Sequence, residues 1–170
     1  MRIETKAAAE LSQFEKARTD CVVTSSLYAY HTGIQWADPD WAVMVWEDEE
    51  LVTTVQIIER LARVGRRSLR LGGIGNVSTK VEWRKRGFAT AALKAAQEFL
   101  AEPLKVDFGL MICTEAMIAY YEKMGWKNVA ASLLMEQEQG KLPLNYPVMV
   151  LPVLEKEWPE GTIDLLGLPW

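Results

Sequence analysis

The sequence is poor in the residues that metal sites, disulfide frameworks and histidine-based catalysis require. Its 170 residues include one histidine, His31, and two cysteines, Cys21 and Cys113. A single histidine excludes catalysis built on several histidines and a zinc site of the common Cys/His spacing, so we expect no metal. Two cysteines far apart in sequence do not make a disulfide framework and indicate the reduced thiols of a cytoplasmic protein.

Long apolar runs and a strong net charge are also missing. No apolar stretch reaches membrane-spanning length, so we do not expect the protein to associate with a membrane. Residues 1–6 lack the apolar segment of a signal peptide, so we expect no secretion signal. The formal net charge of −4 does not favour nucleic acid. Hydrophobic residues at 49% and charged residues at 25% are typical of a globular protein. We expect residues 1–170 to form one domain, as a monomer or a homodimer.

The first half of the chain predicts a helix and then strands. Apolar residues at three- and four-residue steps predict a helix from Ala7 to Tyr30. Its expected buried side chains are Leu11, Phe14, Ala17, Cys21 and Val22. Strand formers at 41–46 and 51–58, on either side of a polar turn, predict a hairpin. Residues 59–70 hold five arginines and are expected to be a solvated hairpin connection, with phosphate or partner binding as the alternative.

The second half alternates strands and helices. Residues 69–81 predict a strand whose three glycines, Gly72, Gly73 and Gly75, indicate a bulge or a close backbone approach. An Ala- and Leu-rich helix is expected from 87 to 101, a strand from 106 to 113, and a short helix from 116 to 124. Hairpins followed by this alternation predict an α/β domain with a mixed sheet.

A basic, glycine-containing turn joins the glycine-bearing strand to the helix. It reads Arg84-Lys85-Arg86-Gly87-Phe88-Ala89-Thr90. The first amides of a helix are unpaired and its dipole attracts anions, so this turn predicts a ligand that carries phosphate. A Walker loop and a complete Gly-x-Gly-x-x-Gly fingerprint are both absent. An ordinary solvated turn is the alternative.

Two motifs in this region resemble the GNAT acetyltransferase superfamily. Arg84-x-x-Gly87-x-Ala89 is similar to its Gln/Arg-x-x-Gly-x-Gly/Ala signature, and residues 119–126 (AYYEKMGW) resemble a second family segment about thirty residues on. The resemblance covers residues 41–129. It implies the GNAT fold, a mixed central sheet with a splayed strand pair and flanking helices, and it implies acetyl-CoA as co-substrate.

The resemblance also assigns residues to the co-substrate and to the acid. The amides of the turn would hold the pyrophosphate, and the backbone of Val77, Ser78 and Thr79 would pair with the pantetheine arm. Tyr121 occupies the position of the usual general acid, and a phenol can protonate a departing thiolate. The alternative for Tyr120 and Tyr121 is two core aromatic residues. Cys113 is expected to be a buried structural thiol rather than a nucleophile, and His31 a surface residue rather than a pocket residue.

The general base stays unassigned. Gly109 stands where protein-acetylating members often carry glutamate, and residues 72–77 contain no carboxylate. Asp107, Glu82 and Glu115 remain, but their strand and turn positions direct them away from the thioester. A chain of water molecules is the alternative.

The end of the sequence and an early loop suggest an acceptor. Residues 158–170 resemble the tail of aminoglycoside 2′-N-acetyltransferases, which implies that the carboxylate of Trp170 reaches the acceptor; a tail whose tryptophans pack on the surface is the alternative. Trp36 and Trp41 flank Asp38 and Asp40 in this loop and would suit a bulky cation, and a place in the core is the alternative for the tryptophans. The expected acceptor is a primary amine of a small molecule, a polyamine or an aminoglycoside-like antibiotic. Protein or peptide N-acetylation and non-catalytic acyl-CoA sensing are the alternatives.

Overall fold

The computed structural model describes residues 1–26 and 33–170, and the chain divides into two compact units. The first unit comprises the described parts of residues 1–33, 39–58 and 74–99. The second comprises residues 34–38, 59–73 and 100–170. The chain passes between the units within its two longest strands, β3 and β4. That residues 1–170 form one domain stays a prediction.

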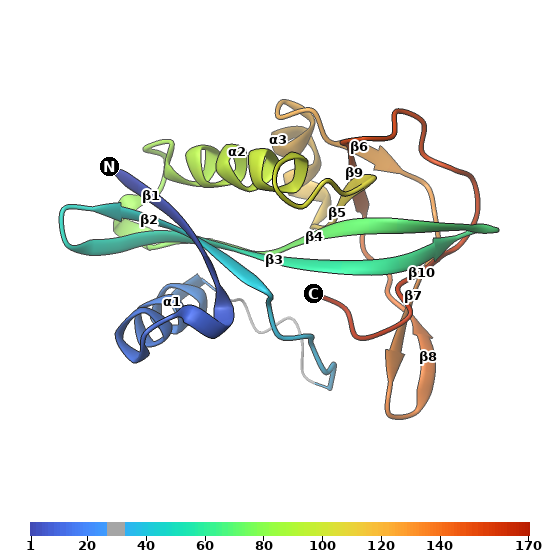
Figure 1. The fold of residues 1–170 in the computed structure, drawn as a ribbon, viewed down its shortest axis with the longest axis horizontal. Coiled ribbons are helices and arrows are strands. Elements are labelled where there is room, and N and C mark those ends of the chain that lie inside the picture. Colours follow the sequence, from blue (N-terminus) through green and yellow to red (C-terminus); the bar gives the residue numbers. More distant parts are fainter. Residues whose placement is uncertain (27–32) are drawn as a thin grey trace. The chain divides into compact units, whose positions relative to one another are not determined.

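The described residues contain ten strands, three α-helices and three short 3₁₀ helices (Figure 1). The strands are β1 (Arg2–Ala7), β2 (Trp41–Glu47), β3 (Glu50–Val64), β4 (Arg67–Thr79), β5 (Phe108–Ile112), β6 (Lys127–Val129), β7 (Leu133–Gln137), β8 (Gly140–Pro143), β9 (Val148–Pro152) and β10 (Ile163–Asp164). The helices are α1 (Gln13–Ser26), α2 (Phe88–Ala101) and α3 (Ile118–Glu122), with 3₁₀ helices at Ala8–Glu10, Val81–Trp83 and Glu115–Met117. None of the helices that the structure describes is long and apolar enough to cross a bilayer.

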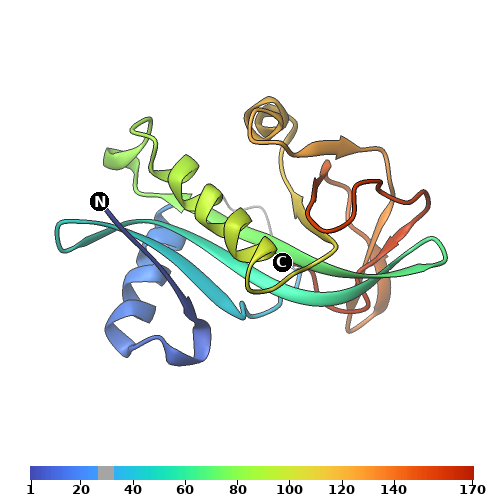
Figure 2. The same cartoon turned by 45° about the horizontal axis from the view of Figure 1, so that its top comes forward.

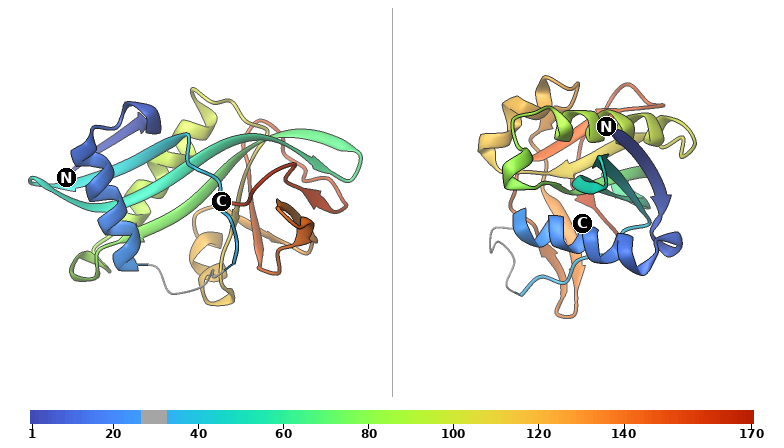
Figure 3. Two further views of the ribbon diagram at one scale, coloured as in Figure 1. Left: turned by 90° about the horizontal axis from the view of Figure 1, so that it is seen from below. Right: turned by 90° about the vertical axis from the view of Figure 1, so that its left-hand side faces the viewer.

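The first unit is a layered α/β structure. Strand β1 pairs antiparallel with β2, and β2 pairs antiparallel with β3. Helices α1 and α2 lie on opposite faces of these strands (Figures 1 and 3). On one face the core is a cluster of Val22, Ala42, Met44, Trp46 and Leu51. On the opposite face, Phe99 of α2 packs edge to face on Trp41, with ring centroids 5.6 Å apart. Helix α2 runs along the direction of the long strands (Figure 2).

The N-terminal prediction was wrong in two respects. The chain opens with strand β1 where no strand was expected, because pairing with β2, some forty residues away in sequence, leaves no local signal. Helix α1 also buries a different face from the predicted one. Phe14, Ala17 and Cys21 are exposed; Val22 is buried as predicted, together with Val23, which was not predicted. The predicted end of this helix at Tyr30 lies outside the described residues, as does His31.

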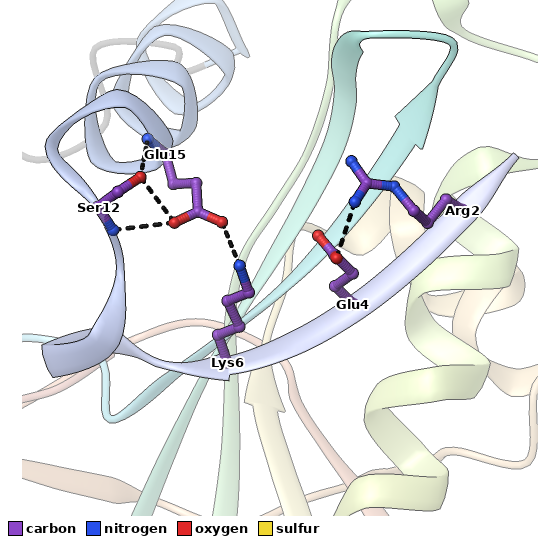
Figure 4. Close-up of polar contacts among 5 residues, drawn as sticks. All are labelled: Arg2, Glu4, Lys6, Ser12 and Glu15. Carbon is purple, nitrogen blue, oxygen red and sulfur yellow. Dashed lines mark hydrogen bonds and ion pairs between the residues drawn. The ribbon is translucent and has the colours of Figure 1, made fainter.

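Helix α1 begins with a capping box that the sequence analysis did not use. The Ser12 hydroxyl accepts a hydrogen bond from the Glu15 amide (3.2 Å), and the Glu15 carboxylate accepts one from the Ser12 amide (2.9 Å) (Figure 4). The same carboxylate binds the ammonium of Lys6 on β1. The Lys6 ammonium and the Ser12 donors lower the pKa of Glu15 to about 2. The box therefore sets both the start of α1 and its attachment to β1.

The second unit is a mixed sheet. Its strands follow the order β6-β9-β5-β4-β3-β10-β7-β8, with β4 and β5 parallel and β5 and β9 antiparallel. Two residues of β10 connect β3 to β7. Asp164 of β10 accepts hydrogen bonds from Lys141 (2.5 Å), Arg63 (3.2 Å) and the Leu166 amide (3.1 Å). This nearly buried carboxylate ties three strands together.

The arginine-rich segment is strand rather than hairpin connection. Strand β3 extends to Val64 and β4 begins at Arg67, so that only a two-residue turn separates them. Ala62, Val64, Leu69 and Leu71 are buried while the residues between them are exposed. This period of two is the signature of a strand with one covered face. The five arginines made the whole segment look solvent-exposed, so the alternation of apolar residues did not lead to the prediction of a strand.

Candidate functional site

The predicted anion-binding turn has the geometry that such a site requires. Gly87 has a φ of 86°, a conformation that glycine adopts without strain, and the helix begins at the next residue. The Ala91 amide donates to the Gly87 carbonyl (3.0 Å), which makes it the first amide of the regular helical ladder. The amides of Phe88, Ala89 and Thr90 precede that ladder. Apart from Gly87 itself and its two chain neighbours, no described residue has an atom within 4 Å of the position that a Gly87 side chain would take, so a ligand can approach these amides closely.

The three basic residues of the turn are exposed but differ in how they are held. The Arg84 side chain donates to the Thr79 carbonyl at the end of β4 (3.1 Å). The Arg86 guanidinium lies over the Trp83 ring at 4.2 Å and the Phe88 ring at 5.5 Å. Lys85 stands at the tip with a φ of 60°. All three charges are presented around the start of α2, with Arg84 and Arg86 in fixed positions.

Strand β4 leads into this turn, and its pairing with β5 ends part-way along its length. Its parallel register with β5 runs from Leu71–Phe108 to Gly73–Leu110, and within the described residues no further pair of this register follows, although β4 continues to Thr79. Asn76, with a φ of 46°, interrupts the regular strand just before Val77. Ser78 is buried and the Thr79 hydroxyl is 2.9 Å from that of Thr53 on β3. An unpaired strand edge offers amides and carbonyls to an extended ligand.

Tyr121 lies in the second unit, on helix α3, and it is buried at 6% exposure. Burial raises the pKa of Tyr121 above its usual value, and Cys113 and Tyr120 raise it further. The phenol is therefore protonated across the neutral range, as a proton donor must be. Tyr120 packs edge to face on Tyr121. Cys113 is half-buried, with burial raising its thiol pKa; this disfavours a thiolate nucleophile.

Gly109 is glycine because three side chains surround it. A methyl group there would lie 3.0 Å from the ring of Trp126, 3.1 Å from Leu100 and 3.2 Å from Leu151. The space that a side chain at position 109 would need is thus filled by neighbouring side chains. The carboxylate of Asp107 accepts a hydrogen bond from the Arg70 amide (2.7 Å) and so has a structural partner. Glu82 and Glu115 are exposed.

The chain end packs inside the second unit rather than on its surface. The Trp170 side chain is 9% exposed, and its Nε1–H donates to the Leu110 carbonyl (3.3 Å). Its ring covers Gly73, where a methyl group would come within 2.1 Å of the indole. The Arg60 guanidinium lies over the same ring at 5.4 Å. Gly73 and Gly72 therefore mark close approaches, as predicted; the tail approaches Gly73, and Leu100 of α2 approaches Gly72.

The early loop and the tail, both predicted to face an acceptor, are joined in the second unit. The Ala37 amide donates to the Pro169 carbonyl (2.8 Å), and the backbone of Gln35 bonds twice to the side chain of Gln137. Trp36 is half-buried and Asp38 is exposed. Asp40 is exposed and belongs to the first unit, where its amide donates to the Ile57 carbonyl (2.9 Å). Only Trp36 and Asp38 thus share a unit with Trp170; no sequence signal links the loop to the tail.

Metal ligands do not cluster in the described part of the chain, where no three His, Cys, Asp or Glu side chains come close enough to hold an ion.

Comparison with known proteins identifies the fold. A family model for an acetyltransferase (GNAT) domain matches residues 12–129. Among curated proteins no match in sequence was found. Similar solved structures include Escherichia coli ElaA, with 15% identity and a TM-score of 0.64 over 89% of this chain and 99% of that chain.

Two further similar structures illustrate different acceptors. The ribosomal-protein-S18-alanine N-acetyltransferase of Escherichia coli is 10% identical, with a TM-score of 0.58 over 92% of this chain and 97% of that chain. FeeM, an N-acyl amino acid synthase from uncultured soil microbes, is 13% identical, with a TM-score of 0.61 over 89% and 91%. At these identities the likeness is one of fold, and it confirms the predicted α/β fold with a mixed sheet and flanking helices.

Proposed function

Because this chain belongs to the GNAT acetyltransferase family, whose members transfer an acyl group from an acyl-CoA, we propose that it transfers the acetyl group of acetyl-CoA to a primary amine of a small molecule. The observation that carries the proposal is the open turn at the start of α2. Beyond its two chain neighbours, no residue has an atom within 4 Å of the position of a Gly87 side chain, and the three residues before Gly87 are basic. A pyrophosphate is the group such a turn suits best.

The backbone of β4 next to this turn would pair with the pantetheine arm. Strand β4 continues past its last pair with β5 at Gly73–Leu110, through Val77, Ser78 and Thr79. An extended, amide-bearing ligand would complete the strand edge by backbone hydrogen bonds. A backbone amide of β4 would also stabilise the negative oxygen that develops during transfer.

The acetyl transfer needs one proton donor on the protein. The amine nitrogen attacks the thioester carbonyl carbon, the C–S bond breaks, and the sulfur leaves as a thiolate. Tyr121 gives its phenolic proton to that sulfur and regains one from solvent, while the amine loses its proton to water. The phenol of Tyr121 is protonated at neutral pH, as this role requires, and burial raises its pKa, so the transfer depends on the basicity of the departing thiolate. A water relay is the proposed base, because Gly109 leaves no room for a carboxylate.

The acceptor we propose is a cationic small molecule, a polyamine or an aminoglycoside-like compound. Trp36 and Asp38 offer an aromatic face and a carboxylate within the unit that holds the tail, and Asp40 adds a second carboxylate on the same loop.

The experiment that tests the function measures coenzyme A release as free thiol, with acetyl-CoA and a panel of amines. The panel contains polyamines, aminoglycosides, amino acids and peptides with a free N-terminus. We expect turnover with a polyamine or an aminoglycoside. Turnover with peptides alone would assign the chain to peptide acetylation, and tight acetyl-CoA binding without turnover would make it a sensor.

A matched pair of variants tests the turn itself by calorimetry. Gly87→Val places a branched side chain over the amides in an unfavourable backbone conformation, and it should weaken acetyl-CoA binding at least tenfold. Gly140→Val, also at a positive-φ glycine with no neighbour within 4 Å, should leave that affinity unchanged. Equal affinities for the two variants would contradict the assignment of the turn.

A further inference from the structure

The indole of Trp170 touches both residues of the last pair between β4 and β5. Its Nε1–H donates to the carbonyl of Leu110 (3.3 Å), and its ring covers Gly73 so closely that a methyl group there would stand 2.1 Å from Cε2. Gly73 and Leu110 are register partners, and the parallel register between these strands goes no further in the described residues. One side chain thus marks the place where the two strands stop pairing.

The opposite face of the same strands is covered by a different residue. Successive residues of a strand face opposite sides of its sheet. A methyl group on Gly72 would stand 2.3 Å from Leu100, and one on Gly109 3.1 Å from the same side chain. Leu100 and Trp170 therefore cover opposite faces of adjacent pairs, and glycine at 72, 73 and 109 is what lets both approach.

Trp170 is held in place by contacts from three directions. The Arg60 guanidinium stacks over its ring and also donates to the Leu168 carbonyl. The Ala37 amide donates to the Pro169 carbonyl (2.8 Å), and the Glu136 amide to the Gly167 carbonyl (2.8 Å). A tail bonded at successive residues is ordered before any ligand arrives, so it can position what it touches.

We propose that the Trp170 indole is a positioning residue that ends the β4–β5 pairing at Gly73–Leu110 and thereby keeps the following part of β4 available to the pantetheine arm. The inference rests on the proposed function and concerns the indole ring of Trp170. Its ligand is the acyl-pantetheine end of an acyl-CoA. It assigns the tail a role in donor binding.

The decisive experiment is a double-mutant cycle on acetyl-CoA affinity, measured by calorimetry. Gly73→Ala displaces the ring and should raise the Kd about tenfold or more. In a Trp170→Ala background the added methyl has no ring to displace, so the same change should alter the Kd less than about twofold. Equal effects of Gly73→Ala in both backgrounds, or no effect in either, would overturn the proposal. Trp158→Phe, a change in the tail's other tryptophan, which packs on Phe108, should leave the Kd unchanged.

A spectroscopic measurement on the wild-type chain keeps the test open if variants fail to fold. With ¹⁵N-tryptophan labelling, the indole N–H signal lost in Trp170→Phe is assigned to Trp170. We expect it to exchange slowly with solvent and to shift when acetyl-CoA is added. Acetyl-CoA binding without a shift of this signal would refute the positioning role. A wild-type chain that binds no acetyl-CoA at all would instead refute the proposed function.

Discussion

Restoring the missing strand glutamate should unfold the protein rather than supply a base. The position is Gly109, the second residue of β5, where a side chain would meet Trp126, Leu100 and Leu151 at 3.0–3.2 Å. These neighbours come from three separate segments, and Trp126 and Leu100 are themselves buried. Because none can move without disturbing the core, Gly109→Ala and Gly109→Glu form a graded series.

The size of the effect follows from two opposing terms. Overpacking a core typically costs about 1–3 kcal/mol. Removing a glycine restricts the unfolded chain and returns about 0.4–1 kcal/mol where the backbone is compatible. Gly109→Ala should therefore lower the free energy of unfolding by about 0–2.6 kcal/mol. Gly109→Glu adds the burial of a carboxylate, worth several kcal/mol more, against a typical total of about 5–15 kcal/mol.

Urea unfolding followed by circular dichroism measures both changes. We expect a lower midpoint for Gly109→Ala at an unchanged slope, and little folded Gly109→Glu at 25 °C. For comparison, Gly140→Ala changes the exposed first residue of β8, where alanine displaces no residue beyond the chain neighbours and adds only the strain of a φ of 108°. If Gly109→Glu folded with wild-type stability and gained activity at low pH, both the packing argument and the relay-water proposal would be wrong.

Three further predictions concern the acid and two ion pairs. Tyr121→Phe should lower kcat at least about a hundredfold and change the Kd for acetyl-CoA less than about threefold, with Tyr120→Phe as control; equal losses in both constants would rule out the acid role. The pKa of Glu15 is lowered from 4.5 to about 2, so the ionised carboxylate contributes stability above pH 4.5 that is lost as the pH falls toward 2. Glu15→Gln should therefore lose less stability than wild type between pH 7 and pH 3 in urea titrations. Parallel pH profiles of the two proteins would contradict this. Asp164→Asn removes charged hydrogen bonds to Lys141 and Arg63 and should cost about 1.5–3 kcal/mol at pH 7; an unchanged urea midpoint would show that these pairs add nothing.

The turn from Arg84 to Thr90 and its helix could be predicted from the sequence because their signals are local. A glycine that adopts positive φ, an alanine-rich helix directly after it and basic residues beside it all lie within one short segment. Tyr121 was likewise placed on a short helix by its flanking residues, and Gly125 ends that segment with a φ of 90°. These features depend on the conformational preferences of neighbouring residues.

Tertiary structure decided everything that depends on contacts between distant residues. Strand β1 exists because it pairs with β2, the arginine-rich segment is strand because its alternate residues are covered, and Gly109 excludes glutamate because Trp126 lies against it. The tail shows the difference best. The sequence indicated that Trp170 matters, but only the fold places its ring on Gly73 and its N–H on Leu110. Such contacts join residues up to about a hundred positions apart, and no local preference encodes them.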